Sequence, residues 1–418
     1  MTQSVTTLNA MMKYSQAGLV SLIPNSVKLY KMITEKKVKE AEMTAGRKLL
    51  VAVEASAPGG ATYGDGTAFE YNTVIDATYP EAQLDCFPVV LGASLSNSVI
   101  DRLAKNPIQG VSVTGMKSKS LFNELAKIAE ISMFYGKSSK GVGTVGAVTG
   151  SSGTSLVVTF TTGQWAAGIW AGRKNIAFEV RSPVGAAKAG TTKAKLLTVL
   201  SIDFVNKKVT FTGDATEIAT VAANDVLFPF GAYSNDMVGL DAQLTTDGVL
   251  FGIDNTVVEL FRGTRYTLAS RNFAELVKAV GAAVTIGGLQ DDTICFINSD
   301  VYEALNSTVT NQNYRNQGEK NNDKVTVGTS GALTFKTAAG ECTLLGSPLI
   351  KEADAFIFNI DDLDVYGVKV IDFGGSVSKD DYWEPLPNNY GARMQGAYEF
   401  AIMLKHPAQG VKVTVPAA

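Results

Sequence analysis

Side chains that could form an active site are scarce in this sequence. His406 is the one histidine, so any Ser/His/Asp or Cys/His arrangement would have to use it. It lies between two expected strands, a position typical of a turn residue. Cys86, Cys295 and Cys342 have no paired spacing, which favours buried free thiols over zinc ligands or disulfides. We therefore expect no catalytic residue and no metal site, and synthesis in a reducing cytoplasm.

Carboxylates are the remaining chemical option. Asp361, Asp362 and Asp364 lie close together in sequence, as do the acids at 291–292. Such groups could act as an acid–base pair or bind calcium, but neither set has the spacing of a calcium-binding loop. The glycine-rich string at 141–146 leads into β-rich sequence, and no P-loop is present. We expect solvated or helix-capping acids and no cofactor.

The charges of the first hundred residues are segregated. Residues 49–100 carry six carboxylates and no Lys or Arg, whereas residues 1–48 carry eight bases and three acids. The acidic segment is expected to form a strand, a loop of small residues at 55–67 and a second strand. A long hairpin of this kind is marginal in water unless another surface holds it. We infer that the holding surface belongs to another copy of the same protein.

Composition limits the class of protein. The chain has 418 residues, 45% hydrophobic and 18% charged, with a net charge of −3. This length favours at least two domains, and the net charge excludes a strongly basic nucleic-acid binder. No apolar run approaches the roughly 20 residues that span a bilayer, so no membrane contact is expected.

Periodicity predicts the elements of the N-terminal part. Residues 26–45 are expected to form a helix, which is either an ordinary solvated surface helix or an arm that docks on a neighbouring subunit. The hairpin strands are predicted at 49–54 and 83–91. The strongest helix is predicted at Ser120–Tyr135, with Ser120 as the N-cap and Gly136 after its last residue. Its apolar stripe is wide enough to pack on a sheet.

The middle of the chain is rich in strands. Residues 137–232 are expected to form a small all-β barrel or sandwich, with strands at 155–160, 176–180 and 208–212. Ten bases against five acids in this block leave open a basic patch or a merely solvated surface.

Strands and helices alternate in the last part of the chain. We predict a helix at 272–280, a strand at 292–298 and a helix at 299–306, followed by a polar loop at 311–324. A strand at 397–404 and a strictly alternating Val411, Val413 and Val415 close the chain. The fold class is therefore α+β.

The order of these segments resembles that of the major capsid proteins of tailed bacteriophages, which have the Hong Kong 97-type fold. The resemblance covers nearly the whole chain and rests on sequential agreement rather than on one specific motif. The segments that carry it are Ser96-Asn-Ser-Val-Ile-Asp101, Met133-Phe-Tyr-Gly136, the glycine-punctuated stretch at 239–254, Asn298-Ser-Asp-Val-Tyr-Glu-Ala-Leu305 and Ala401-Ile-Met-Leu-Lys-His-Pro407.

The resemblance implies a domain assignment. An N-terminal arm would be followed by an extended β-hairpin loop, a peripheral domain with its spine helix, an inserted β-rich domain, an axial domain with parts of the peripheral domain, and C-terminal peripheral strands. The corresponding ranges are 1–48, 49–93, 94–136, 137–232, 233–390 and 391–418.

The resemblance also implies a function and partners. The chain would be a structural, non-enzymatic protein that assembles through pentamers and hexamers into an icosahedral or prolate head shell around double-stranded DNA. It would be made in the host cytoplasm and located in the virion. A separate scaffolding protein, a portal protein and non-specific contact with the packaged DNA are expected. The sequence leaves open whether the inserted domain braces neighbours or docks decoration proteins.

Charge pattern suggests which residues meet across subunits. The acidic loop would face basic residues of a neighbour. Some members of the family that the chain resembles cross-link covalently through a lysine of the extended loop. Residues 49–100 contain no lysine, so no such cross-link is expected here. The candidate inter-subunit contacts are Glu54, Asp65, Glu70, Lys117, Lys119 and Lys127.

Three other classes compete with the capsid interpretation. An encapsulin-like nanocompartment shares the fold but encloses protein. A phage tail or adhesin-type structural protein would account for the Gly/Thr-rich strands but not for the long amphipathic helix. A carbohydrate-active enzyme would need an acidic pair in one cleft, and nothing in the sequence places one there.

Overall fold

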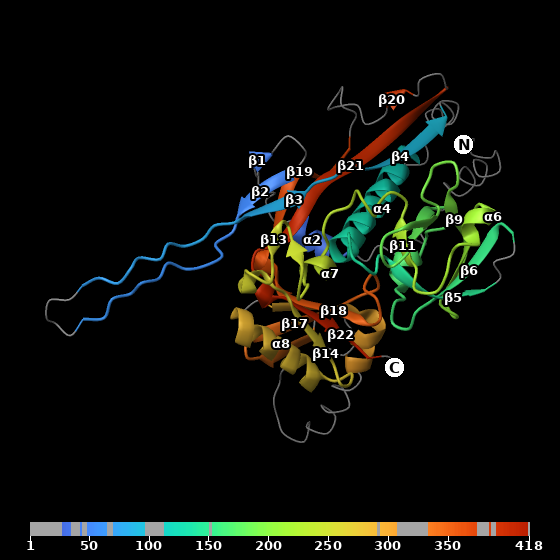
Figure 1. Ribbon diagram of the computed structural model, residues 1–418. Coiled ribbons are helices and arrows are strands. Elements are labelled where there is room, and N and C mark those ends of the chain that lie inside the picture. The colour runs from blue at the N-terminus through green and yellow to red at the C-terminus, as the bar shows by residue number, and fades with distance from the viewer. Residues whose placement is uncertain are drawn as a thin grey trace, which may run out of the picture.

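The computed structural model of the chain describes ten stretches of residues. These are 27–34, 42–43, 48–64, 70–96, 113–149, 153–290, 293–306, 333–373, 384–385 and 390–416. Three bodies and one long projection are visible in Figure 1: an upper layer around a long strand and a helix, a barrel to its right, a sheet below, and a hairpin that extends to the left. The expected polar loop at 311–324 lies outside the described residues.

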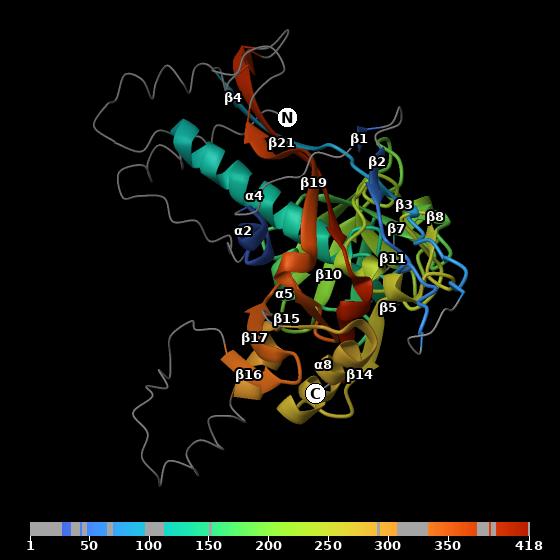
Figure 2. The same cartoon turned by 90° about the vertical axis from the view of Figure 1, so that its left-hand side faces the viewer.

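The upper layer is a helix packed on a sheet. Helix α4 crosses strand β21, which pairs antiparallel with β19 along one half and with β4 along the other. Figure 2 shows α4 lying alongside this sheet. The elements are α4 (Val113–Tyr135), β4 (Val89–Ser96), β19 (Leu363–Phe373), β20 (Glu384–Pro385) and β21 (Gly391–Leu404).

Helix α4 corrects one boundary prediction. It begins at Val113, so Ser120 is an interior residue and not the predicted N-cap. The C-terminal boundary at Tyr135 is confirmed. The left-handed residue after it is Lys137, with φ +50°, whereas Gly136 is required for close approach: a Cβ there would lie 2.3 Å from the Met237 carbonyl oxygen.

The hairpin strand predicted at 83–91 is two strands that belong to different sheets. Strand β3 pairs with β2, whereas β4 pairs with β21. Pro88 lies between them and has no amide proton for a ladder. The three-stranded sheet at the hairpin root consists of β1 (Glu42–Met43), β2 (Lys48–Ala52) and β3 (Glu81–Asp85).

Residues 143–229 form a closed β-barrel. The strand order is β11-β5-β6-β10-β9-β7-β8, and β11 also pairs with β7, so six strands close on themselves and β8 is attached outside. The strands are β5 (Gly143–Thr149), β6 (Ser155–Phe160), β7 (Ala177–Arg181), β8 (Ala187–Ala189), β9 (Leu197–Asp203), β10 (Lys208–Thr212) and β11 (Val226–Pro229). The predicted barrel and the strand at 155–160 are thus confirmed.

Aromatic side chains fill the barrel. The Trp170 ring lies 5.1 Å from Phe160 and 5.0 Å from Phe178, and it stacks with Trp165. The barrel also carries two one-turn helices, so its content is not entirely β. They are α5 (Ala167–Trp170) and α6 (Ala215–Ile218).

The lower body is a six-stranded mixed sheet with a helix on it. Its order is β14-β22-β18-β15-β17-β16, with parallel pairs β14–β22 and β15–β17. The strands are β14 (Thr264–Thr267), β15 (Thr293–Asn298), β16 (Leu333–Thr337), β17 (Gly340–Ser347), β18 (Asp354–Asn359) and β22 (Val411–Thr414). The predicted strand at 292–298 is confirmed to within one residue.

Helix α8 (Phe273–Gly287) covers this sheet, and its predicted start is confirmed. The Asn272 side chain accepts a hydrogen bond from the Glu275 amide at 2.9 Å, which caps the helix. Residues 299–306 are helical, as predicted, and Asn298 caps them by accepting from the Asp300 amide at 2.9 Å. The remaining short elements are α2 (Leu29–Thr34), α7 (Leu240–Gln243), β12 (Val249–Leu250), β13 (Ile253–Asp254), η1 (Glu259–Phe261), η2 (Ile360–Asp362) and η3 (Pro407–Gln409).

The barrel is joined to the lower sheet through buried hydrogen bonds. The ammonium of Lys351, which is fully buried, donates to the Gly141 carbonyl oxygen at 2.8 Å and to Gln164 Oε1 at 3.1 Å. The Gly168 amide donates to the Pro348 carbonyl oxygen at 2.9 Å. These contacts fix the barrel on the body of the same subunit.

Candidate inter-subunit surfaces

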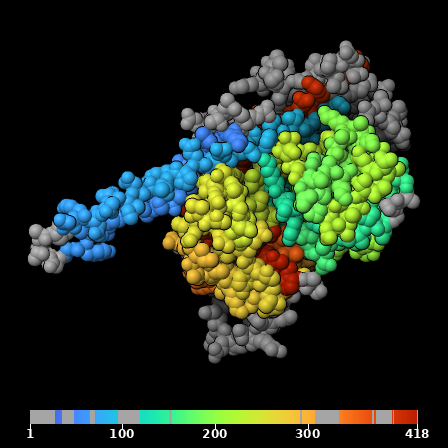
Figure 3. Space-filling model, in the orientation of Figure 1, coloured from blue at the N-terminus to red at the C-terminus, as the bar shows by residue number. Residues whose placement is uncertain are grey.

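The hairpin at residues 53–80, of which the structure describes 53–64 and 70–80, extends two arms that leave the body without resting on it. Beyond the β2–β3 ladder, two isolated bridges link its arms, Ser56 with Thr78 and Gly59 with Ile75. Asn72 ties the arms near the tip by donating to the Ala61 carbonyl oxygen at 2.7 Å. Figure 3 shows this segment standing clear of the molecular surface. The hairpin therefore holds its shape through few local bonds, as its composition predicts.

Large apolar side chains on the hairpin face solvent. Tyr63 is 93% exposed and Val74 is 75% exposed. An exposed row of this kind marks an interaction surface. The other large exposed members are Tyr71, Ile75 and Tyr79. The sequence interpretation used only the charges and the small residues of this loop, although three tyrosines in a segment with no core of its own were an available signal.

The hairpin root is fixed in place. The Gln83 amide donates to the Phe251 carbonyl oxygen at 2.7 Å, and the Lys48 ammonium donates to Gln83 Oε1 at 3.1 Å. Beyond the root, Lys137 forms a 2.6 Å ion pair with Asp85 and lies over the Phe87 ring. The projection thus has a defined direction where it leaves the subunit.

The six candidate contacts are distributed unevenly. Glu54 and Glu70 lie on the exposed hairpin, and Lys119 is exposed on α4. Lys127 is 4% exposed and its ammonium donates to the Ala171 carbonyl oxygen, so in this structure it bonds within its own subunit and is not available to a neighbour. Lys117 lies in α4, and Asp65 lies outside the described residues. Among the described residues of one subunit, no hairpin acid is paired with Lys119.

Lys127 belongs to a polar seam between α4 and the barrel. Burial and, to a smaller extent, the neighbouring Arg173 guanidinium lower the pKa of Lys127 to about 8. Arg173 is itself buried and lies 3.3 Å from Glu124 of α4. These side chains serve contacts inside the subunit, which the sequence alone did not indicate.

The expected N-terminal helix is short and folded back on its own subunit. The prediction for residues 26–45 is wrong in length, because α2 spans Leu29–Thr34 and residues 42–43 are a strand. Leu29 and Ile33 are buried, and the Tyr30 ring meets Phe122 of α4 edge-on at 6.5 Å. The solvated helix is therefore wrong for residues 29–34, whereas docking of the N-terminal arm on a neighbour stays a prediction.

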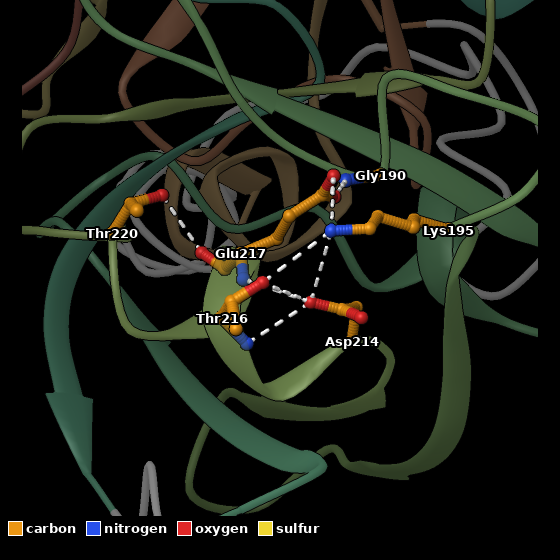
Figure 4. Close-up of polar contacts among 6 residues, drawn as sticks. All are labelled: Gly190, Lys195, Asp214, Thr216, Glu217 and Thr220. Atoms are coloured by element: carbon orange, nitrogen blue, oxygen red, sulfur yellow. Dashed lines mark hydrogen bonds and ion pairs between the residues drawn. The ribbon is translucent and has the colours of Figure 1, made fainter.

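The barrel carries a polar cluster around α6, shown in Figure 4. Asp214 caps α6 by accepting from the Thr216 amide at 3.0 Å, and the Lys195 ammonium lies 3.4 Å from Asp214. Glu217 accepts from the Gly190 amide at 2.9 Å. The hydrogen bond from the Thr216 hydroxyl lowers the pKa of Asp214. The charges here are paired locally, as on an ordinary solvated surface.

Of the residues first considered for catalysis, the acids at 291–292 lie outside the described residues. His406 Nδ1 lies 3.0 Å from Asp362 Oδ1 on the exposed surface, and the three cysteines are buried free thiols, as predicted. Within the described residues, no group of three or more His, Cys, Asp or Glu could hold a metal ion. In the same part of the chain, no helix is long and apolar enough to cross a bilayer.

Comparison with known proteins gives a match at the level of structure. No family model matches the chain, and no curated protein matches it. The capsid asymmetric unit of Cyanophage A-1(L) is similar, with a TM-score of 0.50 at 10% identity, over 95% of this chain and 94% of that chain. The chain has the fold of a phage capsid protein. This confirms the expected α+β capsid fold, and at 10% identity the likeness concerns the fold alone.

Two further capsid structures are similar at lower TM-scores. The capsid of the native GTA particle has a TM-score of 0.46 at 10% identity, and the match covers 100% of this chain and 100% of that chain. The capsid of Cyanophage P-SCSP1u has a TM-score of 0.43 at 12% identity, over 96% of this chain and 92% of that chain.

Proposed function

We propose that this chain is the major capsid protein of a tailed phage and assembles into the icosahedral or prolate head shell that encloses its double-stranded DNA. One observation carries the proposal: a chain with a capsid fold over nearly its whole length holds out a hairpin on which large apolar side chains, such as Tyr63 and Val74, are mostly exposed in the subunit. The role is structural rather than catalytic, and its location is the virion.

The proposed parts follow the bodies of the fold. The hairpin at 53–80 is the extended loop, α4 is the spine helix of the peripheral domain, and the barrel at 143–229 is the inserted domain. The six-stranded sheet with α8 is the axial domain, around which pentamers and hexamers form. A scaffolding protein, a portal protein, decoration proteins and non-specific contact with packaged DNA are the proposed partners.

Docking of the hairpin on a neighbour follows from its exposed apolar surface. Burying apolar area contributes about 25 cal/mol per Å², and a flexible reaching element can bury its area at several subunit angles. Closed shells need such tolerance, because pentamers and hexamers place the same subunit in slightly different geometries. The hairpin therefore supplies contact area without requiring one rigid interface.

Opposite charges are proposed to guide this docking. Charge reversal in Glu70→Lys is expected to weaken assembly, and Lys119→Glu in the same chain to restore part of it. Exposed pairs contribute at most about 1 kcal/mol and are screened by salt, so the effect should fade at high ionic strength. If neither substitution changes assembly at low salt, opposite charges do not guide docking of the hairpin.

Electron microscopy tests the shell function directly. The chain is expressed with and without a scaffolding protein, and negative-stain images are compared with those of a variant whose residues 56–78 are replaced by a two-residue turn. We expect closed shells from the intact chain with scaffold and folded, unassembled subunits from the variant. A variant that assembles as well as the intact chain would contradict the role of the hairpin.

The content of the particles separates the two kinds of shell. Double-stranded DNA in native particles supports the capsid function, whereas particles that hold protein and no nucleic acid would favour an encapsulin-like compartment. Efficient closure of shells from this chain alone would contradict only the proposed scaffolding partner.

A further inference from the structure

Helix α4 carries a carboxylate that is wholly buried beneath α2. Glu130 has no exposed surface, and its Oε2 accepts a hydrogen bond from the Tyr30 amide at 3.1 Å. The backbone amides of Lys28 and Leu29 also act on this carboxylate. The first amides of a helix lack partners within the helix, so Glu130 caps α2 from another helix, 100 residues away in sequence.

Helix α2 depends on this contact and on its apolar face. A six-residue helix is unstable by itself, so docking on α4 must maintain it. Leu29 and Ile33 are buried, and the Tyr30 ring packs against Phe122. When docking fails, the helix itself is lost.

Burial of Glu130 outweighs the partners that favour its ionised form. Glu130 Oε1 has no hydrogen-bond partner among the described residues. In the same part of the chain, the charged group that acts on the carboxylate is Lys28, whose side chain is exposed. On α4, Lys127 bonds to Ala171 on the barrel side. From β19, the backbone at Ile371 meets the Tyr30 phenol. A buried, poorly paired carboxylate is costly in its ionised form.

We propose that Glu130 is a proton-operated latch that holds α2 on α4 firmly when protonated and loosens it when ionised. The inference stands on this buried contact and does not require the shell function. Burial raises the pKa of Glu130 to about 7, while the Tyr30 amide opposes the shift. Undocked, the carboxyl has its ordinary pKa of about 4.3.

The direction of the pH effect follows from these two pKa values. The docked state binds the proton more tightly, so docking is favoured at low pH and weakens as pH rises from the undocked pKa to the docked pKa. With a docked pKa of about 7, the docking equilibrium falls about tenfold between pH 6 and pH 8. Below pH 4 and above pH 8 the docking equilibrium should be nearly independent of pH.

Hydrogen exchange measured by mass spectrometry tests the latch on the full chain. Protection of a peptide covering 27–34 is compared at pH 6 and pH 8 after correction for intrinsic exchange. Wild-type protection should fall about tenfold, whereas Glu130→Gln, which keeps the size and a carbonyl acceptor without charge, should remain equally protected at both values. A wild-type peptide with constant protection would overturn the proposal.

A second variant separates the latch from simple loss of packing. Ile33→Ala removes apolar contact and should lower protection at both pH values while the tenfold pH dependence persists. If Glu130→Gln keeps the wild-type pH dependence, another group titrates and the latch is wrong. If Glu130→Gln is less protected than wild type even at pH 8, the ionised carboxylate is the better cap and the sign of the proposal is overturned. Should Glu130→Gln fail to fold, constant protection of the wild-type peptide between pH 6 and pH 8 would still overturn the proposal.

Discussion

Substitution of one exposed valine on the hairpin should weaken the shell and leave the subunit intact. Val74 is 75% exposed in the subunit, so Val74→Ser removes little from the free chain, and surface changes of this kind stay within about 0.5 kcal/mol. Full burial of a valine contributes about 1.5–3 kcal/mol. Three quarters of that range, about 1–2 kcal/mol, is the most that each docked hairpin can lose.

The matched control is Val205→Ser, because Val205 is 89% exposed at the β9–β10 turn of the barrel, outside the hairpin. Two measurements are compared: thermal unfolding of unassembled subunits and the urea midpoint for disassembly of shells, followed by light scattering. We expect only Val74→Ser to lower the disassembly midpoint, and neither change to alter subunit unfolding. Equal effects of both changes on shells would refute the assignment of the docking surface to the hairpin. A lowered unfolding temperature of the Val74→Ser subunit would show that the valine packs within its own chain.

Three other outcomes are expected. The hydrogen bond that His406 donates to the Asp362 carboxylate raises the pKa of His406, so this contact stabilises the fold below about pH 6.5 and the stabilisation is lost as pH rises through the raised pKa. As His406 is the one histidine, NMR titration of its ring proton should show the raised pKa, and Asp362→Asn should return it to about 6.5. Gly168→Ala would place a Cβ 2.6 Å from the Pro348 carbonyl oxygen and should destabilise the fold by about 1–3 kcal/mol. The control Gly281→Ala meets no atom within 4 Å inside α8 and should stabilise it by roughly 0.5–1 kcal/mol in chemical denaturation. Denaturing gels of mature particles should show monomer, because the hairpin has no lysine that could form a covalent cross-link. A ladder of linked oligomers would contradict this expectation.

Local patterns in the sequence were enough to predict some elements. The barrel strand at 155–160 and the strand of the lower sheet at 293–298 have continuous apolar sequence, and the side chain of Asn272 marks the start of α8. The dependence of the hairpin on another surface followed from its composition, and the structure shows the projecting arms. In these segments, propensity, capping and burial all favour the same structure.

Other features depend on contacts between distant segments and were not visible. Glu130 lies on the helix row of Phe122, Ala126 and Phe134, and a charge in that apolar row was an available but unused signal. Lysine is usually a surface residue, yet Lys127 donates to the Ala171 carbonyl oxygen, 44 positions away in sequence. The closure of the barrel through β11 and β7 joins strands that are far apart in the chain, and no local periodicity specifies such a pairing.

Closure of the barrel leaves few strand edges through which molecules could associate at high concentration. An open sheet presents unpaired amides and carbonyls that recruit strands from other molecules. In the barrel, β11 meets β7, and among the described strands the exposed edge is the three-residue β8. A barrel of nearly ninety residues can thus be kept at high local concentration with little risk that strands exchange between molecules. Foreign sequence introduced at the β9–β10 turn should likewise be displayed without promoting aggregation.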